Sequence, residues 1–266
     1  MSLAIERFTS SEMGAWSNSY LISGQHEAIL FDVFMLREDT AALVDRIKAT
    51  GKTLTRVFIS HAHPDHFMGT EVIVDHFPAV EVISTPATIA NVMEDGPWML
   101  ELLQKKLGPK GPQRIVVPRP VPGKELTVDG VTLEIVEFEE GESKHVSTIL
   151  IPSQQAHITA DLIYHQAHCY LAEKWPEAWL KRLQDLEAFC RNKVSKIYPG
   201  HGEPGEPAPL IESTRAYLRE FLDAIQLGNA KASEERMLTK FPDRHARQFL
   251  SMFTIPTYFP AKGAAG

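Results

Sequence analysis

Short apolar runs bounded by turn-prone residues recur along the first third of the chain. Four of them predict strands, at residues 19–22, 28–31, 56–59 and 80–83. Between them lie stretches with apolar residues at helical spacing, which predict a helix over residues 37–50 and another from Thr70. Gly51 is suited to end the first of these helices. This alternation indicates helices packed on sheets.

The remainder of the chain changes from helix to strands and back to helix. Residues 91–107 have helical spacing and precede a connector rich in glycine and proline at residues 108–112. Strands are expected from Ile115 to Ile151, with a hairpin turn at Asp129-Gly130. Helices are expected over residues 177–192 and over most of the chain after Gly205, most clearly at residues 214–227.

Composition and charge narrow the class of protein. The 266 residues are 44% hydrophobic and 23% charged, enough apolar material for a layered core. The formal net charge of −7, without a lysine or arginine cluster, argues against nucleic acid and anionic membranes as partners. The two cysteines, Cys169 and Cys190, form neither a disulfide framework nor a CxxC pair. No secretory signal and no run of ~18 apolar residues is visible, so we expect a cytoplasmic protein.

The candidate chemistry is concentrated in the segment His61-Ala62-His63-Pro64-Asp65-His66, directly after the strand expected at residues 56–59. In extended backbone, alternate side chains share a face, so His61 and His63 are expected to point the same way. Pro64 fixes its own φ and helps to turn the chain, which lets Asp65 and His66 face a neighbouring position. Imidazole and carboxylate are suitable ligands for zinc, and also for iron or manganese.

The HxHxDH pattern resembles the signature of the metallo-β-lactamase superfamily. Three further segments resemble other parts of that family's pattern in the same order: Asp32 its buried acid beneath the metals, Asp161 its bridging carboxylate, and Pro199-Gly200-His201-Gly202 its late metal-binding histidine. The resemblance covers about residues 18–204. It implies an α/β (α+β) fold of the four-layer αββα sandwich type. We therefore expect a catalytic domain over residues 1–206 and a helical C-terminal extension over 207–266, packed on the same domain.

One segment departs from the family's pattern. Where the family normally offers a further histidine, this chain has Gly141-Glu142-Ser143-Lys144-His145. Glu142 stands at the position of that histidine, and His145 could supply an imidazole if the loop is shifted. A site completed by water, or partly vacant, is the third alternative.

The resemblance implies two metal ions, zinc first and iron or manganese as alternatives. His61, His63 and one loop residue would hold the first ion, and His66, His201 and Asp65 the second, with Asp161 bridging. Asp65 would also pass a proton to the leaving group, as a catalytic residue. Tyr164 could donate a hydrogen bond to the substrate carbonyl, as a tyrosine does in lactonase-like members; simple packing is the alternative.

The expected function is hydrolysis of an ester, thioester or lactone, with a small molecule as the partner. The alternatives are an iron-dependent oxidoreductase of the same fold and a catalytically degenerate binding scaffold. The C-terminal extension is rich in large apolar side chains, among them Phe249, Met252 and Phe253. They suggest a lid or a homodimer contact, against plain core packing as the alternative.

Overall fold

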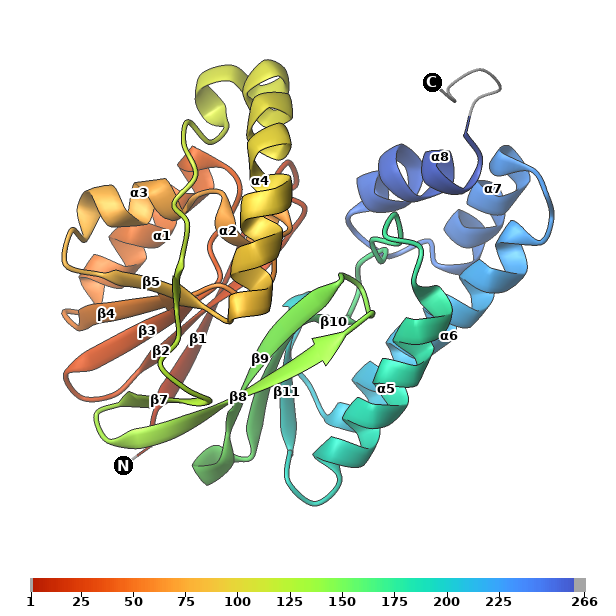
Figure 1. Ribbon diagram of the computed structural model, residues 1–266. Coiled ribbons are helices and arrows are strands. Elements are labelled where there is room, and N and C mark those ends of the chain that lie inside the picture. The colour runs from red at the N-terminus through yellow and green to blue at the C-terminus, as the bar shows by residue number, and fades with distance from the viewer. Residues whose placement is uncertain (1, 261–266) are drawn as a thin grey trace.

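The computed structural model describes residues 2–260, and four layers are visible in it: helices, two sheets face to face, and helices again (Figure 1). Both sheets are mixed, and their strands follow one another in sequence order. The first sheet contains β1 (Ala4–Thr9), β2 (Asn18–Ser23), β3 (Glu27–Phe31), β4 (Thr53–Phe58), β5 (Glu81–Ser84) and β6 (Arg119–Pro120). The second contains β7 (Glu125–Val128), β8 (Val131–Glu139), β9 (His145–Ile151), β10 (Ala156–Tyr164) and β11 (Lys196–His201). The expected αββα sandwich is confirmed.

The strands of the first sheet are covered on both faces, which explains their nearly continuous apolar sequences. Along β3, Ile29 and Phe31 face the second sheet, whereas Leu30 faces the helices. Phe31 stacks on Phe58 of β4 with ring centroids 5.7 Å apart, in the core between the sheets. Alternation along one strand therefore supplies both apolar layers.

Helices cover the outer face of the first sheet. They are α1 (Arg37–Ala49), α2 (Pro64–Phe67), α3 (Thr70–His76), α4 (Pro86–Leu107) and the 3₁₀ turn η1 (Gly108–Lys110). Helix α4 begins five residues earlier than its periodicity predicts. Pro86 occupies its first turn, where the missing N–H leaves no helical bond unmade.

The Asp129-Gly130 hairpin is present between β7 and β8. Both residues have positive φ, +45° and +79°, the conformation of the tight turn that suits the twist of a hairpin. The 3₁₀ turn η2 (Pro152–Gln154) joins β9 to β10.

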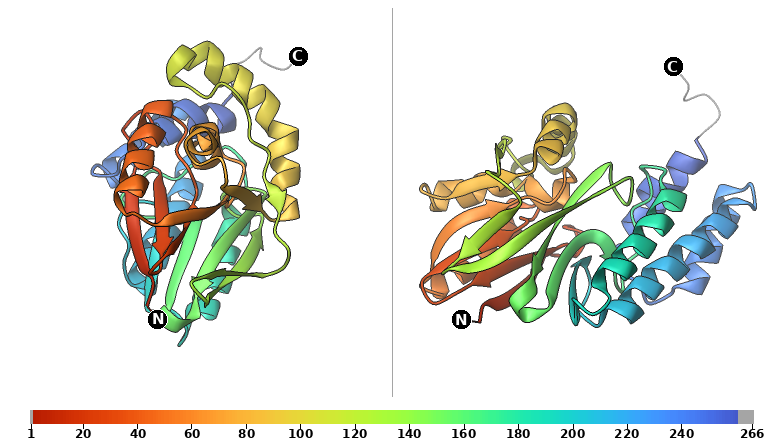
Figure 2. Two further views of the ribbon diagram at one scale, coloured as in Figure 1. Left: turned by 90° about the vertical axis from the view of Figure 1, so that its left-hand side faces the viewer. Right: turned by 60° about the horizontal axis from the view of Figure 1, so that its bottom comes forward.

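The second sheet is covered by α5 (Pro176–Cys190) and α6 (Pro207–Ile225), which lie side by side (Figure 2). Beyond α6 follow α7 (Ala230–Lys240), the π-helix η3 (Phe249–Thr254) and α8 (Ile255–Tyr258). Thr214 of α6 contacts the backbone of Tyr164 through its hydroxyl. This hydroxyl accepts a hydrogen bond from the amide of Tyr164 at 3.2 Å and lies 3.0 Å from the carbonyl oxygen of Tyr164. The predicted helical extension therefore packs on a strand that carries site residues.

Two sequence expectations concern Cys169, Cys190 and membrane spans. Both cysteines are buried and unpaired. Among residues 2–260, no helix is at once long enough and apolar enough to cross a bilayer.

Candidate metal centre

Two residues separate the end of β4 at Phe58 from His61, the first residue of the HxHxDH segment. The second half of the segment forms the start of α2. His63 keeps extended backbone, and Pro64 opens the helix at its first position, where a proline is tolerated best. This change of direction places the His61 and His63 rings 4.8 Å apart and brings His66 to 4.5 Å from His61. The first sheet thus presents three imidazoles together.

The second sheet supplies the opposing donors from three places. Glu142 lies in the short loop between β8 and β9, Asp161 within β10, and His201 at the end of β11. The register between β10 and β11 breaks on either side of Ala160, whose φ is +46°, so the strand changes course just before Asp161. Gly200 is required here because a Cβ atom would lie 1.7 Å from Asp161 Oδ1.

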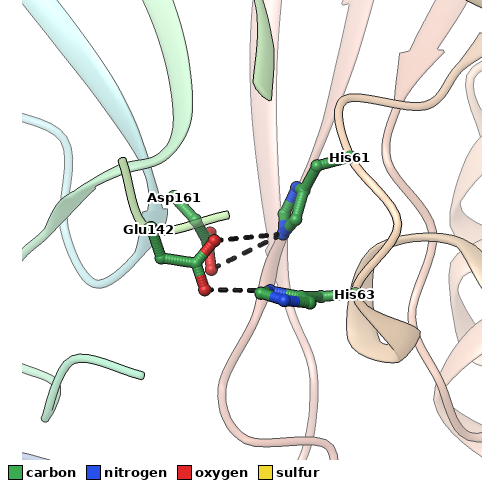
Figure 3. A group of neighbouring side chains, drawn as sticks. All are labelled: His61, His63, Glu142 and Asp161. Atoms are coloured by element: carbon green, nitrogen blue, oxygen red, sulfur yellow. Dashed lines mark ion pairs between the residues drawn. The ribbon is translucent and has the colours of Figure 1, made fainter. Parts of the chain in front are cut away.

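The first donor group joins both sheets (Figure 3). His63 Nδ1 lies 2.9 Å from Glu142 Oε1, and His61 Nε2 lies 3.7 Å from Glu142 Oε2 and 3.9 Å from Asp161 Oδ2. One donor atom from each of these four side chains lies within 4.8 Å of all the others. The group therefore offers two imidazoles and two carboxylates to one ion-sized position.

The second donor group adjoins the first through Asp161. His66 Nε2 lies 3.2 Å from Asp161 Oδ1, and His201 Nε2 lies 3.3 Å from Asp161 Oδ2. Asp65 Oδ2 lies 3.6 Å from the former nitrogen and 3.5 Å from the latter. Asp161 thus lies next to histidines of both groups, as the bridging role implied by the family resemblance would require.

Hydrogen bonds to the outer ring nitrogens orient three of the histidines. The hydroxyl of Ser60 donates its proton to Asp32 at 2.7 Å. Ser60 Oγ is therefore the acceptor for His61 Nδ1, which donates to it at 2.8 Å. His66 Nδ1 donates to Asp32 at 2.9 Å, and His201 Nδ1 donates to the carbonyl of Ala15 at 3.1 Å. In the neutral ring this leaves the Nε2 lone pair directed at the cluster, the tautomer that a metal ligand needs.

His63 differs from these three histidines because it directs Nδ1, not Nε2, at the cluster. Its Nδ1 faces Glu142, and its Nε2 lies 3.4 Å from Glu173 Oε1. Glu173 belongs to the irregular segment between β10 and α5. Sequence reasoning missed it because this segment has neither a motif nor a periodic pattern.

Tyr164 lies against the cluster with its side chain fully buried. Its hydroxyl donates to Asp161 Oδ2 and lies 3.3 Å from Glu142 Oε1. Burial, with the nearby carboxylates, raises the pKa of this phenol well above its usual value, so the hydroxyl remains a donor. In the structure this hydroxyl contacts a ligand candidate, and its donation to a substrate carbonyl stays a prediction, with packing as the alternative.

Burial and neighbouring charges shift the pKa values of several groups in the cluster. Burial raises the pKa of Glu142 to about 7. Burial alone would lower the pKa of His201, but Asp161 and Asp65 raise it to about 9. Burial, aided by the positive charge of His66, lowers the pKa of His61 well below its usual value. Carboxylates and imidazoles thus face one another at short distances, an arrangement that also suits a cation.

The loop that departs from the family's pattern directs Glu142 inward and His145 elsewhere. Within it, the amide of Gly141 donates to the carbonyl of Ser143 at 3.1 Å. Glu142 is buried in the cluster. His145 opens β9 opposite Glu139, and its Nδ1 lies 3.9 Å from that carboxylate. Because adjacent residues of a strand face opposite ways, the burial of Val146 leaves His145 half-exposed and outside the cluster.

Six buried atoms at the centre of the cluster lack a hydrogen-bond partner. Buried polar atoms are normally satisfied, so a convergent set without partners is unusual. Nitrogens and carboxylate oxygens in this arrangement suit divalent metal ions. The residues present therefore fit a metal centre. The six atoms are His61 Nε2, Asp65 Oδ2, His66 Nε2, Glu142 Oε2, Asp161 Oδ1 and His201 Nε2.

Comparisons with known proteins agree with this geometry. A family model described as "Metallo-beta-lactamase superfamily" matches residues 17–201, and the chain belongs to that superfamily. Among solved structures, a metallo-beta-lactamase from Pontibacter korlensis has a TM-score of 0.62 at 18% identity, over 82% of this chain and 99% of that one. The DIM-1 metallo-beta-lactamase gives 0.61 at 18%, over 82% and 98%, and TMB-1 gives 0.61 at 18%, over 83% and 98%. Family membership and the donor cluster together support a metal-dependent hydrolase in general terms.

Proposed function

We propose that this protein is a hydrolase that holds two metal ions, zinc by preference, and cleaves an ester, thioester or lactone. His61, His63, Glu142 and Asp161 would hold one ion, and Asp65, His66, His201 and Asp161 the other. The observation that carries the proposal is the convergence of six unpartnered, buried donor atoms from two sheets.

The reaction adds one water to the acyl carbon and breaks its bond to the leaving oxygen or sulfur, giving a carboxylate, an alcohol or thiol, and one proton. When bound, two such ions supply an activated water near neutral pH and positive charge for the developing oxyanion. Asp65 is the candidate for carrying the proton to the leaving group. Its side chain is 11% exposed, so part of it can meet a substrate.

Other side chains hold these groups in place. Asp32 accepts a hydrogen bond from His66, and the hydroxyl of Tyr164 donates to Asp161 and would orient this carboxylate towards the ions. The second donor set contains no thiol. Cys169 is buried, and burial raises its pKa to about 12, which makes it a poor thiolate ligand. The second set therefore consists of imidazoles and carboxylates alone, which distinguishes it from a site with a cysteine ligand.

A second candidate function follows from Glu142. Together with His61 and His63 it forms a set of two imidazoles and one carboxylate, which suits non-haem iron as well as zinc. An iron-dependent oxidoreductase is therefore the alternative function.

Elemental analysis of the purified protein distinguishes the two. We expect about two zinc ions per chain in the wild type, with a clear loss in His61→Ala and in Glu142→Ala. His145→Ala is the matched control, because this histidine lies outside the cluster. Esters, thioesters and lactones are then assayed with the zinc-loaded protein.

Iron in place of zinc, with oxygen-dependent turnover, would move the assignment to the oxidoreductase. A chain that binds no metal after reconstitution would exclude both enzymes. If His145→Ala loses as much metal as Glu142→Ala, the assignment of Glu142 as a ligand is wrong.

A further inference from the structure

The candidate metal centre meets solvent on one side only. The side chains of His63 and Asp65 are 10% and 11% exposed, whereas those of the other donors are at most 2% exposed. A substrate must therefore approach over His63 and Asp65.

An aromatic surface begins at this open side. We call Tyr170, Phe249 and Phe253 the aromatic wall. The ring of Tyr170 lies 4.8 Å from that of His63, 5.7 Å from Phe249 and 5.9 Å from Phe253. Phe249 also meets His201 at 5.3 Å. Phe249 is buried and Phe253 is 37% exposed, so the wall runs from the metal donors to the surface.

The wall is held by an unusual helix. Phe249 and Phe253 belong to the π-helix η3, a rare form that is frequent at functional sites. The amide of Leu171, next to Tyr170, donates to Thr254 Oγ1 at 3.0 Å and ties the two segments together. This hydrogen bond fixes the position of Tyr170 relative to η3. The helix η3 lies outside the residues that the family model matches, so its contribution is particular to this chain's C-terminal region.

The charged groups in direct contact with the donors weaken the attraction of an anion, although Lys144 acts on Glu173 from the exposed loop. Across residues 2–260, the ion pairs of Glu142, Asp65 and Asp161 all run to histidines, and no lysine or arginine lies within 4.0 Å of them. With two divalent ions bound, the three ligand carboxylates would leave the centre with a net charge of about +1. A neutral histidine at position 142 would leave about +2. Glu173 adds a further negative charge beside His63. The attraction of an anionic substrate is correspondingly weaker.

We propose that the aromatic wall binds an uncharged apolar group of the substrate, so that the site prefers neutral esters or lactones with an alkyl or aryl portion over anionic ones. This specificity rests on the proposed hydrolase function. Apolar and aromatic lining with few oriented polar groups is the usual composition of small-molecule sites.

The first test compares p-nitrophenyl acetate, hexanoate and octanoate with the mono-p-nitrophenyl ester of suberic acid, using the metal-loaded protein. Suberate matches octanoate in length but ends in a carboxylate. We expect kcat/KM to rise about tenfold or more from acetate to octanoate and to fall again for suberate. Phe253→Ala should remove the length preference, mainly through KM. Met252→Ala is the control, since Met252 neighbours Phe253 in η3 and is 63% exposed.

The second test measures binding without turnover. Calorimetry with 2-nonanone, a neutral ketone that cannot be hydrolysed, should show binding to the wild type and to Met252→Ala but about tenfold weaker binding to Phe253→Ala. Hydrolysis of all four esters at equal kcat/KM would overturn the aromatic wall and leave the hydrolase intact. Binding of the ketone that depends on Phe253, without hydrolysis of any ester, would support the wall and count against the proposed function.

Discussion

His157, a buried histidine on β10, should make the stability of the fold depend on pH. Thr148 Oγ1 donates to the carbonyl of Val136, so it accepts from His157 Nε2 at 2.8 Å; the other ring nitrogen has no partner. Burial lowers the pKa of His157 from 6.5 to about 3. Below pH 6.5 the unfolded chain therefore takes up the proton first, and stability is lost as the pH falls towards 3. Between pH 7 and pH 5 this one group removes about 2 kcal/mol.

The perturbation that tests this is His157→Gln, because the amide can still donate to Thr148 but does not titrate. Urea unfolding, followed by circular dichroism, gives the free energy of unfolding of both proteins at pH 7 and pH 5. The cluster histidines titrate as well, but their contribution cancels in the difference between the two proteins. We expect the wild type to lose about 2 kcal/mol more than the variant between these two pH values. Equal losses would show that His157 has the same pKa in the folded and the unfolded state, and the argument from burial would fail.

Three further substitutions test the architecture of the centre. Tyr164→Phe removes the hydrogen bond to Asp161 and should lower metal affinity or kcat by about 10- to 100-fold; unchanged values in metal titration and steady-state kinetics would mean that the hydroxyl orients nothing. Gly200→Ala places a methyl group on Asp161 and should destabilise the fold by about 1–3 kcal/mol and reduce bound metal, so a variant with normal thermal unfolding and metal content would contradict the close packing. Glu173→Gln should weaken metal binding at the position of His63 by about tenfold, visible as a changed absorption spectrum after cobalt substitution; an identical spectrum would exclude an orienting role.

Local sequence patterns predicted most of the fold because most elements obey local rules. The apolar runs became β2 to β5, and the Asp129-Gly130 pair formed its hairpin. The apolar spacing does not mark the start of α4, because the first turn is opened by Pro86 and not by the periodic residues. The π-helix η3 could not be foreseen, since its extra residue per turn has no sequence signature.

The donor set was predicted from motifs, and the structure brings six of those residues together with Glu142. Spacing alone could not choose between Glu142 and His145, because the direction of a loop side chain depends on the turn that precedes β9. The apolar residues Phe249 and Phe253 were noted in the sequence, but their contact with Tyr170, and the contact of Glu173 with His63, were not predicted, because no motif marks either one. Their contacts join residues more than seventy positions apart, and no local pattern records such a distance.

The division of the donors between the two sheets has a consequence for how the protein matures. His61 through His66 come from the first half of the sandwich, and Glu142, Asp161 and His201 come from the second. During synthesis, the complete set of donors exists only after the ribosome has released the chain through residue 201 and the halves have docked. Tight metal binding would therefore occur late in folding, and the bound metal would link the two sheets. Chelation of the mature protein should loosen the contact between the halves before it melts either one.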